Sequence, residues 1–200
     1  MRNTIIVLLA IILLVSCTSE EEKQQQAIMK EFTTVGDKIT TISFASLSGN
    51  LKAAVSNGGI ENAIRFCKIS AIPLTDSLSS SFNVTIKRTS LKLRNPNNKA
   101  DTLEAYILDL YTQIQKMKKP MVGKTILARN DDVRYFAPII LKSQCLMCHG
   151  TIGQDVSDST YTIIKKYYPT DQAIDFEDGE LRGIWSINFG NINSLKTVAE

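Results

Sequence analysis

The chain has 200 residues, of which 44% are hydrophobic and 22% are charged, and its formal net charge is +3 at pH 7. This length is enough for a domain with a real hydrophobic core. The basic residues are interspersed with acidic ones and form no block, so the composition argues against a nucleic-acid-binding protein.

The N-terminus has the pattern of an export signal. Arg2 is followed by an almost unbroken apolar run from Ile5 to Val15, and residues 14–17 form a small-residue cleavage box that ends in Cys17. A membrane-spanning helix needs roughly 20 apolar residues, and polar and charged residues directly after Cys17 cut this run short. We therefore expect residues 1–16 to be a signal peptide and not a membrane anchor.

The cleavage box resembles the bacterial lipoprotein signal, in which the cysteine thiol is alkylated by a diacylglycerol. This implies that Cys17 is lipidated and begins the mature protein, on the periplasmic or cell-surface side of a membrane. Two or more acyl chains give stable anchoring, and Thr18 with the following glutamates favours the outer membrane. We expect residues 17–26 to be the lipidated cysteine and a flexible spacer, and residues 27–200 to be a single domain.

The first part of this domain is predicted to be a helical hairpin. Apolar residues at steps of three and four predict a long amphipathic helix over 28–57 that ends at Gly58 and Gly59. A second apolar stripe over 60–78 predicts the returning helix, which Pro73 is expected to kink or end. Cys67 lies on the apolar face of this second helix.

The rest of the chain is predicted to be rich in strands. Asp101 and Glu104 have the spacing of a capping box in front of a further helix. Helices at the front and several strands behind indicate an α+β domain, in which helices cover an antiparallel sheet. In chain order the predicted elements are a strand at 84–93, a helix at 103–117, a strand hairpin at 124–129 and 133–141, a short helix at 161–167 and a closing strand at 183–189.

The second strand of the hairpin runs directly into the sequence Cys145-Leu146-Met147-Cys148-His149. C-x-x-C-H is the attachment signature of a c-type haem. On one helical turn the two thiols lie on the same face, where each can add to a vinyl group, and the next residue directs an imidazole at the iron. We expect one covalent haem c on Cys145 and Cys148, with His149 as an axial ligand.

Two interpretations without haem compete with this one. A disulfide between Cys145 and Cys148 would suit an oxidising compartment, and Cys67, Cys145, Cys148 and His149 form a plausible zinc ligand set. Export to an oxidising space argues against zinc. His149 is the only histidine of the chain, and its place directly after the second cysteine favours haem.

The ligand on the opposite side of the iron is not decided by spacing. The single histidine excludes bis-histidine ligation within one chain, and no methionine follows His149. Met117, Met121, an open site and Cys67 are the candidates that remain. Cys67 is interpreted equally well as a small buried hydrophobe.

Five segments, in order along the chain, resemble one family: AIRFCK (63–68), RTSLKLRNPNN (88–98), VRYFAPI (133–139), CLMCHG (145–150) and GELRGIWS (179–186). It is the monohaem c-type family of PAS-like extracytoplasmic domains, which occurs alone or as the sensing part of membrane receptors. The resemblance covers about residues 27 to 190. It implies a PAS-like antiparallel sheet with an N-terminal long helical hairpin and flanking helices.

The resemblance also implies that the haem iron lies between His149 and Cys67. Thiolate ligation would give a low reduction potential, and reduction could loosen Cys67 and open a site for a small diatomic ligand. Charge complementarity suggests a further hypothesis, in which Arg94 or Arg88 contacts a haem propionate. The alternative is a solvated basic strand.

The sequence therefore predicts an extracytoplasmic monohaem module for redox or small-ligand sensing, which acts through a redox or signalling protein partner. A membrane-tethered electron-transfer cytochrome is the first alternative, and a non-haem disulfide or zinc protein is the second. We find no base, nucleophile or acid pair that indicates an enzyme.

Overall fold

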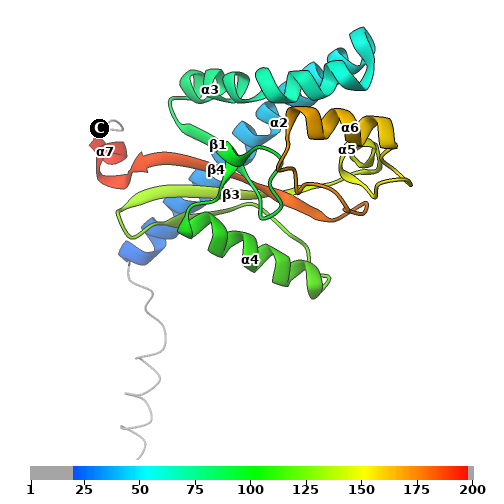
Figure 1. Ribbon diagram of the computed structural model, residues 1–200. Helices are drawn as coiled ribbons and strands as arrows, with labels where there is room; N and C mark the ends of the chain where they lie inside the picture. The colour runs from blue at the N-terminus through cyan, green and yellow to red at the C-terminus, as the bar shows by residue number, and fades with distance from the viewer. Residues whose placement is uncertain (1–19, 198–200) are drawn as a thin grey trace, which may run out of the picture.

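A computed structural model describes residues 20–197 of the chain. The expected signal peptide and Cys17 lie outside the described residues. The fold has three layers, in which helices α2 (Glu20–Ile69) and α3 (Ala71–Phe82) cover one face of a sheet and helix α4 (Thr102–Lys116) covers the other (Figure 1). In the part of the chain that the structure describes, no helix has both the length and the hydrophobicity to cross a membrane.

The helical hairpin turns at Gly58 and Gly59, as the sequence predicts. Gly59 has a φ of +67° and a ψ of −163°, a backbone conformation that is essentially restricted to glycine. The break before α3 lies at Ser70 and not at Pro73. Proline lacks the N–H that would bind the carbonyl of residue 69, so the helix is interrupted one turn ahead of it.

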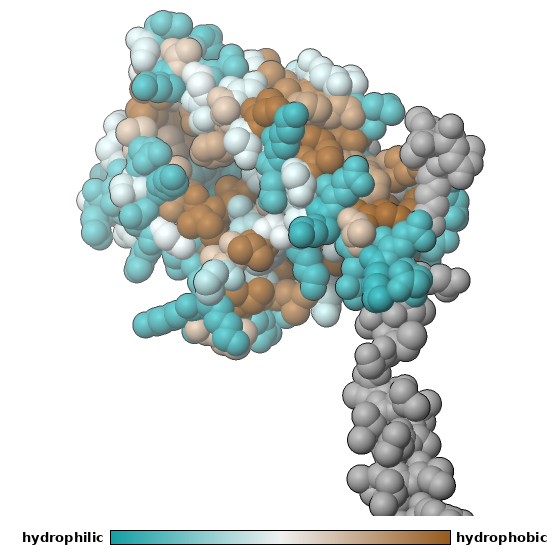
Figure 2. All heavy atoms as spheres, turned by 180° about the vertical axis from the view of Figure 1, so that it is seen from behind, coloured by the Kyte–Doolittle hydropathy of each residue, from teal (hydrophilic) through white to brown (hydrophobic). Residues whose placement is uncertain are grey.

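The start of α2 differs from the predicted spacer. Residues 20–26 already belong to the helix, and Lys23 pairs with Glu20 at 2.7 Å between Nζ and Oε1. Glu, Gln and Lys are good helix formers, so a solvated composition does not exclude a helix here. Helix α2 also exposes the large apolar side chains of Val35, Ile42, Phe44 and Leu51, with exposed fractions between 37% and 52%. Apolar patches lie on the rear face of the molecule (Figure 2).

The sheet is antiparallel and has the strand order β1-β4-β3-β2. Its two central strands are the longest, and the last strand of the chain, β4, lies between β1 and β3. The α+β class and the antiparallel sheet are therefore confirmed. The strands are β1 (Thr85–Thr89), β2 (Lys124–Leu127), β3 (Asp132–Ile140) and β4 (Leu181–Asn191).

Alternate residues of the central strands fill two cores on opposite faces of the sheet, as the period of two in a strand requires. Tyr135 and Trp185 pack toward α2 and α3. Their neighbours Phe136 and Ile184 pack toward α4. A Cβ at Gly36 would collide with the Tyr135 ring, so glycine is what lets α2 lie this close to the sheet.

The segment with the cysteine motif lies at one end of the sheet, where β3 ends and β4 begins (Figure 1). Ile64 of α2 packs there against Ile164 and Tyr168. The hairpin therefore brings residues of the sixties next to residues that follow the motif. The shorter elements are the 3₁₀ helices η1 (Pro96–Asn98) and η2 (Ser143–Cys145) and the helices α5 (Leu146–His149), α6 (Asp158–Tyr167) and α7 (Ile192–Thr197).

Two glycines of α2 give a matched test of the hairpin turn. A Cβ would meet no atom within 4 Å at Gly49 or at Gly59, but only Gly59 has a positive φ. We expect Gly59→Ala to lower the free energy of unfolding by about 1–3 kcal/mol because of backbone strain. Gly49→Ala should raise it by about 1 kcal/mol, since alanine is the better helix former. Denaturant unfolding measures both, and equal effects would contradict the assigned turn.

Candidate functional site

The motif residues lie on a single turn formed by η2 and α5. The N–H of Cys145 donates to the carbonyl of Lys142 at 2.7 Å, and the N–H of Gly150 donates to that of Leu146 at 2.7 Å. A Cβ at Gly150 would come within 2.5 Å of the Asp155 side chain, so no larger residue fits directly after the histidine. This turn carries both cysteines, whose thiols interact electrostatically, and the imidazole directly follows the second of them.

Cys67, Cys145 and Cys148 are all free thiols. The thiols of Cys67 and Cys148 interact electrostatically, although they come from different layers of the fold. Burial raises the pKa of both thiols, and the charge of Arg94 opposes that rise for each. Arg88 adds to the opposing effect at Cys67. The fold therefore brings the Cys67 thiol within electrostatic range of the motif, and no disulfide joins the described cysteines.

The imidazole of His149 is held in one orientation. Its Nδ1 lies 2.7 Å from the carbonyl oxygen of Ala173. A carbonyl can only accept, so Nδ1 carries the proton and Nε2 keeps its lone pair. Burial lowers the pKa of His149 well below its usual value, and the charges of Arg94 and Arg182 add to this. The ring is consequently neutral at pH 7, which is the form that binds metals.

Arg94 connects the motif to the loop that follows α6. Its guanidinium pairs with Asp171 at 3.0 Å (Nε to Oδ1) and 3.1 Å (Nη2 to Oδ2). Nη2 also donates to the carbonyls of Cys148 at 2.6 Å and Ala173 at 2.9 Å. The Arg94 side chain is 11% exposed and that of Asp171 is fully buried. Arg94 therefore hydrogen-bonds to protein groups, which the sequence does not indicate.

Two further arginines lie at the same site. Arg88 stands over the Trp185 ring, with its Cζ 5.7 Å from the centroid, and within residues 20–197 its guanidinium makes no hydrogen bond. Arg182 donates to the Ser90 hydroxyl at 2.6 Å and to a main-chain carbonyl at 2.9 Å. Burial lowers the pKa of Arg182 to about 10, with contributions from Arg94 and Arg88. Arg94 and Arg88 therefore both lie within electrostatic range of Arg182.

Sequence reasoning missed Asp171, the carbonyl of Ala173 and Arg182. Asp171 lies 77 residues from Arg94, and no local pattern links them. Arg182 lies in the segment GELRGIWS, but the residues next to it in the sequence do not indicate that it belongs to the site. The one sequence feature that points to it is the position of this segment at the start of a central strand.

The other proposed ligand sets find no support in the geometry. Among residues 20–197, no group of three or more His, Cys, Asp or Glu side chains is placed to hold a metal ion. The four residues of the zinc alternative therefore do not converge on one point. Met121 packs in the core under α4, and Met117 is 55% exposed. Cys67 is the candidate axial ligand that the fold brings next to the motif.

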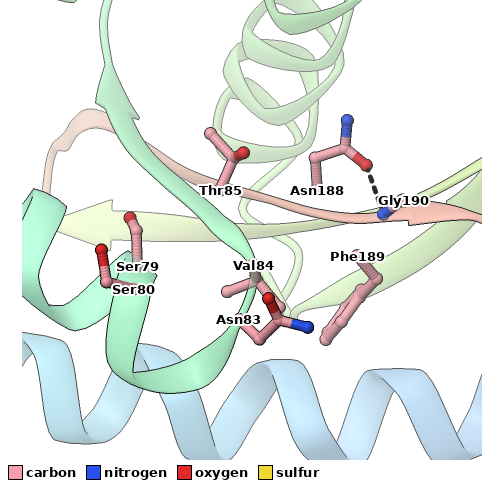
Figure 3. A pocket seen from close by; sticks show the side chains of 8 residues that line it. All are labelled: Ser79, Ser80, Asn83, Val84, Thr85, Asn188, Phe189 and Gly190. Atoms are coloured by element: carbon pink, nitrogen blue, oxygen red, sulfur yellow. Dashed lines mark hydrogen bonds between the residues drawn. The ribbon is translucent and has the colours of Figure 1, made fainter.

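Two pockets lie at the other end of the sheet. One, of about 370 Å³, lies where α3, β1 and β4 meet, and no acidic, basic, His or Cys side chain lines it (Figure 3). The other, of about 180 Å³, opens beside Glu104 and Arg134. Asn188 borders both pockets, whereas the motif adjoins the Leu181 end of β4. Neither pocket belongs to the cysteine and histidine site.

Comparisons with known proteins agree with this architecture. Residues 15–189 match the family described as Tll0287-like. The chain belongs to the Tll0287-like family. A similar solved structure is the crystal structure of the cyanobacterial heme-protein Tll0287, with a TM-score of 0.56 and 22% identity over 80% of this chain and 96% of that chain. At this identity the likeness shows the fold.

The family membership confirms the resemblance that five segments of the sequence indicated. The match begins before α2 and ends within β4, so it includes every residue of the site described above. The comparison with curated proteins found no match.

The Arg94–Asp171 pair gives a stability prediction with a surface pair as its control. We expect Asp171→Ala to lower the free energy of unfolding by about 3–5 kcal/mol, because it leaves a buried guanidinium unpaired. The Lys166–Glu61 pair is exposed at 67% and 54%, with 3.7 Å between Nζ and Oε1. Glu61→Ala should therefore cost less than about 1 kcal/mol. Denaturant unfolding of both variants checks the contrast, and a small loss for Asp171→Ala would contradict it.

Proposed function

We propose that the chain binds one haem covalently, through thioether bonds at Cys145 and Cys148, with His149 as an axial ligand. The observation that carries this proposal is the single turn that presents two free thiols and a neutral imidazole. The Nδ1 of that imidazole is committed to the carbonyl of Ala173, so its Nε2 is the atom available to iron. Membership of the Tll0287-like family supports the proposal.

The charges around the motif fit the acidic groups of a haem. Two guanidinium groups, those of Arg94 and Arg182, interact with one carboxylate, that of Asp171, and the charge of Arg88 also acts on Arg182. The excess positive charge suits the two propionates. Arg88 is the better candidate for a propionate contact, because its guanidinium makes no hydrogen bond within the described residues. Arg94 is already engaged by Asp171 and two carbonyls.

In this proposal Cys67 supplies the second axial ligand. Its thiol interacts electrostatically with that of Cys148. Burial raises the pKa of the Cys67 thiol, and the charges of Arg88 and Arg94 oppose that rise. Bound iron would supply a one-electron couple, and a thiolate ligand would keep its reduction potential low. A thiolate binds ferrous iron less well than ferric iron. Release of Cys67 on reduction would then open a position for a small ligand.

We propose on these grounds that the chain is a redox or small-ligand sensing module and acts through a partner protein. Its placement outside the cytoplasm, lipid-anchored at Cys17, rests on the N-terminal sequence pattern. An electron-transfer cytochrome is the alternative. It differs from the sensor in one measurable respect, because an electron carrier keeps both axial ligands in both oxidation states.

Covalent attachment is tested by expression in a host with a c-type maturation system. We expect the purified protein to be coloured and mass spectrometry to show one haem added to the chain. Cys145→Ser with Cys148→Ser should abolish the covalent adduct. Cys67→Ser is the matched control, because it removes a thiol of the same site but should keep the adduct. A colourless wild-type protein would overturn the proposal.

The ligand role of Cys67 is tested by visible spectra of the oxidised and reduced haem protein. We expect Cys67→Ala to lose the low-spin thiolate signature of the ferric form. The reduced wild-type protein should bind carbon monoxide, because Cys67 is released. If the ferric spectrum of the variant is unchanged, Cys67 is not the ligand. If the reduced wild type refuses carbon monoxide, the electron carrier is favoured over the sensor.

A further inference from the structure

The carbonyl oxygen of Ala173 accepts two hydrogen bonds. His149 Nδ1 lies 2.7 Å from it and Arg94 Nη2 lies 2.9 Å from it. The N–H of the same residue donates to Asp171 Oδ1 at 3.0 Å, and that oxygen also accepts from Arg94 Nε at 3.0 Å. Both main-chain polar groups of Ala173 are thus tied to one ion pair, next to the imidazole of the motif.

The ion pair is buried and its orientation is fixed. Ala173 and the side chain of Asp171 are fully buried, and the side chain of Arg94 is 11% exposed. Water therefore screens the pair little, and its charges act strongly on nearby groups. The positive end touches the carbonyl that His149 uses, whereas the carboxylate makes no hydrogen bond to the imidazole. The charge of Arg94 consequently affects the hydrogen bond of His149 more directly than the charge of Asp171 does.

We propose that Arg94 and Asp171 are positioning residues that set how strongly His149 donates to iron. A stronger hydrogen bond from Nδ1–H makes an imidazole a more basic ligand. Arg94 shares the acceptor and weakens that bond, so it makes His149 a poorer donor and favours ferrous iron. Asp171 partly neutralises Arg94 and acts in the opposite sense. The inference rests on the proposed haem attachment.

The ion pair could act only by holding the loop in place, or also through its charges. If it only holds the loop, loss of either residue loosens the same loop and should shift the properties of the haem in the same direction. Loss of either partner of this pair leaves charges of opposite sign beside His149. The two single variants therefore decide between the two roles by the sign of their effects.

The experiment compares the haem protein with Arg94→Gln, Asp171→Asn and the double variant. Redox titration gives the reduction potential, and resonance Raman spectra of the ferrous protein give the iron–imidazole stretching frequency. We expect Arg94→Gln to lower the potential and raise the frequency. Asp171→Asn should shift both the opposite way. The double variant, with a neutral amide pair, should lie close to the wild type.

An arginine outside the site serves as the control. Arg129→Gln removes an exposed arginine at the turn between β2 and β3 and should change neither the potential nor the stretching frequency. Circular dichroism confirms that each variant is folded. If Asp171→Asn fails to fold, Arg94→Lys replaces it, and this charged variant should lie nearer to the wild type than Arg94→Gln.

Shifts of both single variants in the same direction would overturn this inference, as would an unchanged stretching frequency in Arg94→Gln. Failure of the proposed function would look different, because the wild-type protein would then contain no covalent haem. When every variant carries haem and the potentials do not diverge, only the inference about Arg94 and Asp171 fails.

Discussion

The site depends on one buried ion pair, between Arg94 and Asp171. Its guanidinium binds the carbonyls of Cys148 and Ala173, and so joins the motif turn to the loop after α6. The carbonyl of Ala173 in turn fixes the imidazole of His149. A buried charge is costly unless it is paired and hydrogen-bonded. The pair therefore restricts these three segments to one arrangement, and the direction of the His149 lone pair follows from it.

The three-layer fold explains how a thiol from the front of the chain reaches a motif near its end. The reversal at Gly58 and Gly59 returns the chain along the sheet, and Ile64 packs against residues that follow the motif. Cys67 stands one turn further along the same helix. The long central strands β3 and β4 hold the motif at their shared end. The site is thus built from segments that separate layers bring together.

The local parts of the structure could be predicted because their causes are local. Asp101 and Glu104 form the expected capping box, and the motif forms the expected single turn. The β2–β3 hairpin and the closing strand also follow their patterns. Residues 20–26, where a flexible spacer is expected, belong to α2 in the structure, because a polar composition is compatible with an exposed helix as well as with a flexible segment.

The sequence by itself determined the α+β class and the family, since side-chain type and spacing along one turn or one strand suffice for these. Only the tertiary structure decided which groups surround His149. Asp171 binds Arg94 across 77 residues, and the Cys67 thiol lies within electrostatic range of Cys148 although it comes from another layer. The partner of Arg94 could not be read from its neighbours, because contacts between distant residues are set by how the layers pack and not by any local pattern.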